Sequence, residues 1–298
     1  MTTHTDDTWY ILGAGAIGCL WAAYWRQSGV KVILLTPKKR DHSTLTITAH
    51  EKNHSASIES LTLKQLSTSK ITIQRLLVCT KSQHTLSALN NIKSNIDDNA
   101  PIIILQNGMA TQTIKKHFKQ VIYTAITNDG AYRTDQLSVV HAGHGTTFID
   151  ANKVLLSQLP TRFLDIVICS DIEKIQWQKL AINCAINGLT AIYNCRNGEL
   201  LKHPEAMQRI THVCSEISAL VQHLDIGFSL DDIQKHVEKT IHTTANNYSS
   251  MYKDIEQGNT TEIEMLNGFI CHKAEKLDIS CPENLRIYTE IRQREQQL

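Results

Sequence analysis

The sequence predicts an α/β fold, with an N-terminal Rossmann-like, doubly wound parallel sheet and a C-terminal all-helical domain. In the first 170 residues, short apolar segments typical of strands alternate with helical segments, which is the pattern of a parallel, doubly wound sheet. A strand, a glycine-rich turn and a helix follow one another at its start. From Asp171 onward helical periodicity prevails. We therefore expect two domains, residues 1–170 and residues 171–298.

Composition excludes several classes of function. The 298 residues carry 30 basic and 29 acidic side chains, so bulk charge favours neither a nucleic acid nor a membrane surface as partner. The eight cysteines form no C-x-x-C pair and most lie in apolar segments, as expected in a reducing cytosol. The polar segment Met1–Thr8 has no signal-like apolar core, and no apolar run is long enough to cross a membrane. We expect a cytoplasmic protein.

The first strand, Trp9–Leu12, runs directly into the sequence G-A-G-A-I-G at Gly13–Gly18, and a helix is predicted over 19–27. In this context Gly13 permits a tight turn, Gly15 lets a pyrophosphate approach the backbone, and Gly18 allows the helix to pack closely on the strand. The helix N-terminus would face the phosphates. The motif predicts a dinucleotide site, and a glycine turn without a ligand is the alternative.

A second strand, 31–35, ends where NAD-specific folds usually carry an acidic residue for the ribose hydroxyls. Here the chain reads T-P-K-K-R at 36–40. Three cations and a hydroxyl suit a 2′-phosphate, so NADP is favoured over NAD. A solvated basic turn is the alternative.

The sequence H-E-K-N-H at 50–54 matches the zincin motif literally. That motif needs both histidines on one helical face, whereas alternating apolar residues predict strands at 45–49 and 57–63 joined by a polar turn, 50–55. We expect no metal site.

Further strands are predicted at 75–79, 101–106 and 121–125, with helices at 82–95 and 111–118 between them. Ligands of such sheets bind beyond the carboxyl ends of the strands, where Lys81 and Asn107 fall, although either could be a cap or turn residue. A hairpin-like pair, 137–141 with 146–150, and a last strand at 165–169 complete this half.

The second half has predicted helices at 171–187, 203–224, 230–246, 260–276 and 283–297. The first contains W-Q-K-L-A-I-N-C-A-I-N, an apolar segment in which Lys179, Asn183 and Asn187 recur every four residues. At 3.6 residues per turn they form a polar stripe on one face. Two amides beside one cation suit an oxygen-rich ligand, and a solvated helix face is the alternative.

Several motifs together resemble the 2-dehydropantoate 2-reductase (ketopantoate reductase) family, nearly from end to end. They are G-A-G-A-I-G, T-K-S-Q (80–83), Q-N-G-M (106–109), W-x-K-L-A-x-N-C-x-I-N (177–187), N-G-E-L (197–200), S-S-M (249–251) and T-E-I-x-x-L-N-G (261–268). One departure is Pro37, which stands where an arginine for the 2′-phosphate is often found. That task then passes to Lys38, Lys39 or Arg40.

The resemblance implies an active site between the two domains and assigns roles to residues. It implies that Lys179 and Glu262 are catalytic. Substrate would contact Asn107, Asn183, Asn187, Asn197, Asn247 and Ser250. NADPH would contact Gly13, Ala14, Gly15, Ala16, Ile17, Gly18, Lys38, Lys81, Gln83, Asn107, Ala131 and Glu262.

The expected reaction is the NADPH-dependent reduction of ketopantoate to (R)-pantoate in pantothenate and coenzyme A biosynthesis. Hydride transfer to the C2 ketone builds negative charge on its oxygen, and Lys179 can both stabilise that charge and donate a proton. We expect a monomer or homodimer with no nucleic-acid or membrane partner. The alternatives are a related two-domain NADP-dependent dehydrogenase acting on another 2-oxo or 3-hydroxy acid, and a non-catalytic NADPH-binding regulator.

Overall fold

The computed structural model describes residues 7–40, 43–49 and 51–297. The chain divides into two compact units. The N-terminal unit contains the described residues up to Gln106 together with Ala110–Ile172, and the C-terminal unit contains Asn107–Met109 together with the residues from Glu173 onward. The short segment Asn107–Met109 therefore belongs to the C-terminal unit, although it lies far from the rest of that unit in sequence.

The main sheet of the N-terminal unit has the strand order β12-β11-β8-β7-β6-β1-β2-β5 within the described residues. All neighbouring strands are parallel except β8 and β11, so the predicted doubly wound α/β fold is confirmed. Central strands are buried on both faces, as parallel sheets covered by helices require. The strands are β1 (Trp9–Leu12), β2 (Val32–Thr36), β5 (Glu59–Thr62), β6 (Leu76–Val78), β7 (Ile102–Leu105), β8 (Ile122–Thr127), β11 (Thr146–Ile149) and β12 (Asp165–Ile168).

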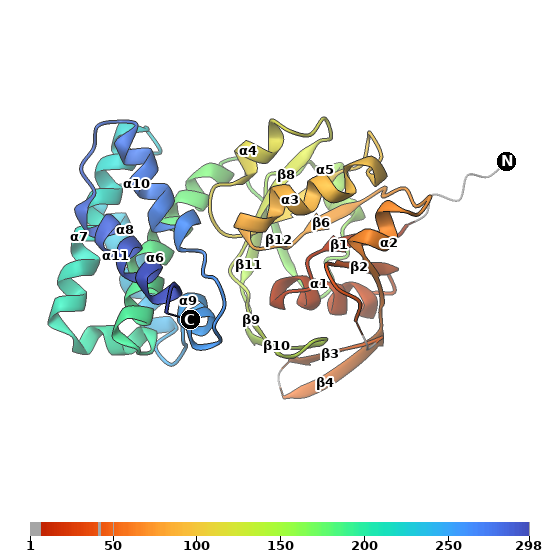
Figure 1. Ribbon diagram of the computed structural model, residues 1–298, viewed down its shortest axis with the longest axis horizontal. Coiled ribbons are helices and arrows are strands. Elements are labelled where there is room, and N and C mark those ends of the chain that lie inside the picture. Colours follow the sequence, from red (N-terminus) through yellow and green to blue (C-terminus); the bar gives the residue numbers. More distant parts are fainter. Residues whose placement is uncertain (1–6, 41–42, 50, 298) are drawn as a thin grey trace. The chain divides into compact units, whose positions relative to one another are not determined.

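Helices cover the two faces of this sheet (Figure 1). One face packs on α2 (Leu63–Ser67), α3 (Ser82–Ile92) and α4 (Thr111–Lys115) through apolar residues such as Leu89 and Ile114. The other face packs on α1 (Ala16–Gln27) and α5 (Lys153–Gln158). The short 3-10 helix η1 (Lys93–Asn95) follows α3.

A small second sheet covers the outer side of α1, with the order β4-β3-β10-β9 (Figure 1). Its strands are β3 (Thr44–Ala49), β4 (Lys52–Ser57), β9 (Gly130–Asp135) and β10 (Ser138–Gly143). The predicted hairpin between 137–141 and 146–150 is wrong, because β10 pairs with β9 and β3 whereas β11 pairs with β8 and β12. The predicted turn 50–55 is also too long, since residues from Lys52 already form β4.

The C-terminal unit is helical. It consists of α6 (Ile172–Tyr193), η2 (Asn197–Lys202), α7 (Pro204–His223), α8 (Leu230–Thr243), α9 (Ser250–Glu256), η3 (Ile263–Met265), α10 (Asn267–Glu275) and α11 (Pro282–Glu295). The single helix predicted over 260–276 is wrong: Leu266 adopts φ −109° and ψ −100°, which separates η3 from α10.

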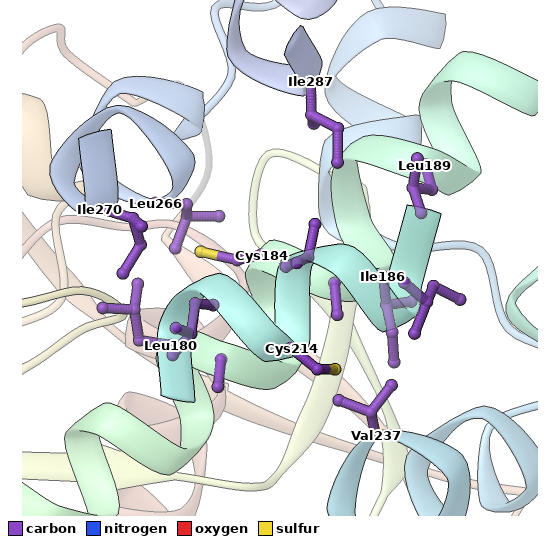
Figure 2. Close-up of a cluster of buried hydrophobic side chains, with 14 of the residues drawn as sticks. Leu180, Cys184, Ile186, Leu189, Cys214, Val237, Leu266, Ile270 and Ile287 are labelled. Atoms are coloured by element: carbon purple, nitrogen blue, oxygen red, sulfur yellow. The ribbon is translucent and has the colours of Figure 1, made fainter. Parts of the chain in front are cut away.

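Helix α6 is the centre of this unit (Figure 2). Its Leu180, Cys184 and Ile186 are buried among side chains of the surrounding helices, among them Cys214 of α7 and Ile287 of α11. Because apolar neighbours enclose α6 over most of its surface, the helix itself is held in place and its polar residues keep their position on its remaining face.

Candidate active site

The glycine-rich turn between β1 and α1 has the geometry of a dinucleotide cradle. Gly13 has φ +106°, and a Cβ on it would lie 2.9 Å from the backbone of Cys79. A Cβ on Gly18 would lie 2.0 Å from the carbonyl oxygen of Gly13, so α1 can begin this close to β1 only with glycine there. A Cβ on Gly15, in contrast, would meet only one atom, the Cys79 carbonyl oxygen at 4.0 Å. Gly15 therefore leaves space beside the first turn of α1, whose amides have no partners within the helix.

Two arginines converge on this turn. Arg40 donates from Nη2 to the carbonyl oxygen of Ala14 at 3.4 Å, and Arg133 of β9 donates from Nη1 to the same oxygen at 3.3 Å. Burial raises the pKa of Cys19 to about 11, and the charges of Arg133 and Arg40 oppose that rise. Lys38, in contrast, is exposed. Of the cations at the end of β2 that the structure describes, Arg40 is the one bonded to the glycine turn.

The residues after β6 and β7 are joined by a hydroxyl network. The Thr85 hydroxyl of α3 lies 2.8 Å from that of Thr80 and donates to Gln106 Oε1 at 2.7 Å. Lys81 is the N-cap residue of α3 and Gln83 lies in the first turn of that helix. Both side chains are partly buried. Ala131 lies on β9 of the small sheet, paired with His141 of β10.

The polar stripe of α6 is present as a half-buried band. Lys179, Asn183 and Asn187 are each partly exposed, whereas Leu180, Ala181, Cys184, Ala185, Ile186 and Gly188 are buried. A helix face turned fully to bulk solvent would be more exposed, so neighbouring side chains partly cover the stripe. Its single cation and two amides lie on the same face of α6.

Hydrogen bonds link the C-terminal end of the stripe, at Asn187, to the start of α9. Thr190 donates to the Asn187 carbonyl oxygen at 2.9 Å and is within 2.7 Å of the Ser249 hydroxyl. Ser249 caps α9 by accepting from the amide of Tyr252, which fixes Ser250 as the first residue of that helix. This network keeps Ser250, which is exposed, close to Asn187.

Asn197 is buried at the start of η2. Its Nδ2 donates to Thr244 Oγ1 at 2.8 Å, and its amide nitrogen donates to the carbonyl oxygen of Asn247 at 3.0 Å. Its Oδ1 is buried and finds no hydrogen-bond partner within the described part of the chain. Buried polar atoms are normally paired, so this acceptor is available to a ligand. Asn247 itself is exposed.

Two further predicted residues meet within the C-terminal unit. Asn107 donates from Nδ2 to Glu262 Oε2 at 3.4 Å. The segment that carries Asn107 is held on α6, because Gln176 Nε2 donates to the Gly108 carbonyl oxygen at 3.3 Å and Met109 joins the apolar core. Sequence analysis associated Asn107 with the sheet that precedes it, whereas its contacts place it with Glu262.

Several residues that shape these sites carry no signal in the sequence. Arg133 lies on β9, where no strand was predicted, and nothing in its local sequence indicates its approach to Ala14. Thr190 and Ser249 are ordinary helix and cap residues until the fold brings them together. In the zincin-like sequence, His50 lies outside the described residues, Glu51 has φ 61° in a turn, and His54 lies on β4. Glu51 and His54 therefore do not share a helical face.

Comparison with known proteins identifies relatives over nearly the whole chain. Residues 9–153 match the family model described as ketopantoate reductase PanE/ApbA, and residues 171–295 match its C-terminal model. A 2-dehydropantoate 2-reductase from Shigella flexneri is 32% identical, covering 96% of this chain and 94% of the relative. One from Yersinia pestis is 30% identical over the same shares.

Solved structures share the fold. A PanE/ApbA family ketopantoate reductase from Ralstonia eutropha JMP134 has a TM-score of 0.89 at 23% identity, covering 97% of this chain and 99% of that one. A D-mandelate dehydrogenase solved with NADH and anilino(oxo)acetate has the same values. A dimeric ketopantoate reductase from Staphylococcus aureus has a TM-score of 0.81 at 18% identity over 97% and 99% of the chains. Among the described helices, none combines the length and apolar character needed to cross a membrane.

Proposed function

Because the chain belongs to the ketopantoate reductase family, we propose that it reduces 2-dehydropantoate to (R)-pantoate and that NADPH is its hydride donor. It is an oxidoreductase, as its curated relatives are. The observation that carries the proposal is the half-buried stripe of Lys179, Asn183 and Asn187 on a helix whose other faces are enclosed by apolar side chains. A cation and two amides on one half-buried helix face suit a small 2-oxo acid better than they suit a structural role.

The glycine-rich turn fits a dinucleotide. The open space at Gly15 and the first amides of α1, which have no partner within the helix, suit a pyrophosphate that bears negative charge near a helix N-terminus. Arg40 and Arg133 supply two guanidinium groups at the same turn. We propose that Arg40, rather than the exposed Lys38 or Lys39, binds the 2′-phosphate, because a planar guanidinium can hold a phosphate through two hydrogen bonds. Lys81, Gln83 and Ala131 complete the proposed cofactor residues.

Lys179 carries the chemistry in this proposal. The chemistry supplied by bound NADPH is hydride transfer to the C2 carbon of the ketone. As the C–H bond forms, the electron pair of the carbonyl π bond moves to oxygen, and the ammonium of Lys179 stabilises that charge. The same ammonium then donates its proton to the alkoxide, giving the C2 hydroxyl of pantoate, and Lys179 is reprotonated from solvent.

The remaining groups orient the substrate. The amides of Asn183 and Asn187 can donate to the substrate carboxylate and accept from its hydroxyl. Ser250 is placed beside Asn187 by the Thr190–Ser249 bond, and Asn197 offers the unpaired Oδ1. Glu262, which accepts a hydrogen bond from Asn107, is proposed to accept a further one from the substrate hydroxyl or from Lys179. Asn247 is proposed to contact substrate from the segment between α8 and α9.

We propose a cytoplasmic location. The eight cysteines are free thiols, which favours a reducing compartment such as the cytoplasm. A monomer or a homodimer is proposed, and sedimentation at two protein concentrations would separate these states.

The test is consumption of NADPH by the purified protein with ketopantoate. Matched reactions contain the 2-oxo acid that corresponds to mandelate, because a D-mandelate dehydrogenase shares the fold. We expect the highest kcat/KM with ketopantoate and a large loss on Lys179→Ala. Turnover of the second acid at a higher kcat/KM would assign a different substrate. A Lys179→Ala variant with wild-type kcat would show that another group donates the proton.

A further inference from the structure

Three potential metal ligands converge in the N-terminal unit, and none of them is among the residues proposed above for substrate or cofactor. Asp129 follows β8, His141 lies on β10, and His144 lies in the turn between β10 and β11. One coordinating atom from each lies within 4.8 Å of the other two. His141 Nε2 is 3.0 Å from Asp129 Oδ1, and the rings of His141 and His144 are 3.8 Å apart between centroids.

Two of these residues are held in place by partners behind them. His141 Nδ1 is 2.6 Å from the Tyr24 hydroxyl. Asp129 accepts from the Thr127 hydroxyl at 2.8 Å and from the Gly145 amide at 2.9 Å. The His141 and Asp129 side chains are 0% and 3% exposed. Histidines and carboxylates that ligate metals are usually fixed in this way, by a hydrogen bond at the atom that does not coordinate.

The third residue gives access to solvent. His144 is exposed and, together with Tyr24, lines a cavity of about 920 Å³. This cavity contains none of the predicted substrate or cofactor residues, and His54 of β4 lies on its wall. His144 therefore connects the cluster with this cavity, which has room for a water molecule as an additional ligand.

We propose that Asp129, His141 and His144 bind a divalent first-row transition metal ion, with Zn²⁺ as the best match. Two imidazoles and one carboxylate are borderline ligands that suit such ions, and three protein ligands leave a fourth position for water. Ligand atoms around a tetrahedral zinc are about 3.4 Å apart, given bonds of about 2.1 Å. The three coordinating atoms lie within 4.8 Å of one another, so they move closer together when the ion binds.

His141 already has a partner at each ring nitrogen: Nε2 lies 3.0 Å from Asp129 Oδ1 and Nδ1 lies 2.6 Å from the Tyr24 hydroxyl. With a metal on Nε2, an Nδ1–H group can donate to the Tyr24 oxygen, which keeps the ring oriented toward the ion. The ion replaces the hydrogen bond between Asp129 and His141 and brings His144 to the same centre.

Titration of the whole, chelator-treated protein with ZnCl₂ in a calorimeter tests the proposal. We expect one equivalent of Zn²⁺ per chain and a higher melting temperature with the metal than without it. His144→Ala should weaken binding by at least roughly tenfold, since losing even a group that supports a ligand has about that effect. Because His144 is exposed, this variant should fold normally. The matched control is His212→Ala, which removes an exposed histidine of α7.

Cobalt substitution identifies the ligands. Co²⁺ at the proposed site should give visible absorption bands of a nitrogen and oxygen site, without a thiolate charge-transfer band, and His144→Ala should abolish them. Absence of stoichiometric binding would overturn the proposal and leave Asp129 and His141 as a hydrogen-bonded pair. A thiolate band with unchanged affinity in His144→Ala would overturn it as well, because cysteines would then hold the metal. These measurements need no ketopantoate and are independent of the reductase activity.

Discussion

Gly15→Ala separates binding of the cofactor from stability of the fold. In the folded chain a Cβ at this position would meet only the Cys79 carbonyl oxygen, at 4.0 Å, which is an ordinary van der Waals distance. Gly15 has φ −76° and ψ −172°, a backbone conformation that alanine adopts without strain. The free energy of unfolding of the protein without cofactor should therefore change by less than about 1 kcal/mol.

Affinity for NADPH should fall, because the added methyl group occupies the space into which the pyrophosphate must move. Loss of one charge-assisted hydrogen bond from the α1 amides costs about 1.5–3 kcal/mol. This corresponds to a roughly 10- to 150-fold rise in Kd. Fluorescence titration with NADPH and calorimetric unfolding without it measure the two effects separately.

Gly18→Ala is the matched control. A Cβ there would lie 2.0 Å from the Gly13 carbonyl oxygen and 3.2 Å from its carbon, and neither backbone atom can move cheaply. This variant should lose about 1–3 kcal/mol of stability even without cofactor, as overpacked sites do. Wild-type NADPH affinity in Gly15→Ala would refute the assignment of this turn as the pyrophosphate site. Equal destabilisation by the two substitutions would refute the distinction between them.

Three further outcomes are expected. Lys179→Ala should lower kcat and kcat/KM together by roughly 10²-fold and leave NADPH affinity unchanged, as measured by steady-state kinetics and fluorescence titration. Arg40→Ala should raise the KM for NADPH by roughly tenfold or more and leave the KM for NADH unchanged. Lys39→Ala, at an exposed side chain, should raise the KM for NADPH less. A larger rise with Lys39→Ala than with Arg40→Ala would assign the 2′-phosphate to the lysine. Asn197→Ala should reduce kcat/KM for ketopantoate by about 1–3 kcal/mol. Thr244→Val, which removes the hydroxyl that anchors Asn197 and its bond to the Thr240 carbonyl but leaves the Asn197 amide in place, should cost less activity, and equal kinetic losses would show that Asn197 has only a structural role.

Local patterns in the sequence were sufficient for the fold class. The glycine spacing at Gly13–Gly18 needs only the residues beside it to specify a tight turn and a close helix, and the structure has both. The four-residue spacing of the α6 stripe places its side chains on one helical face whatever surrounds the helix. The family resemblance rests on continuous stretches of sequence, and the two family models confirm it.

Strand pairing and helix breaks depended on tertiary contacts. The segments that form β10 and β11 are neighbours in sequence and resemble a hairpin, but each finds a better partner elsewhere, β9 and β3 for one and β8 and β12 for the other. The helical pattern over 260–276 gave no sign of the break at Leu266, where the chain turns between η3 and α10. Periodicity reports which face of a segment is buried, and it carries no information about the partner of that face.

The sequence alone determined which residue types were available for the chemistry, namely a glycine turn for phosphates and a lysine with two asparagines on one helix. The tertiary structure alone decided which distant residues join them. It brings Arg133 of β9 to the Ala14 carbonyl, Ser249 to Thr190, and His144 to Asp129 and His141. The physical reason is that these contacts form between elements that pack together only after the apolar faces of the sheets and helices are buried, so their spacing in sequence contains no trace of them.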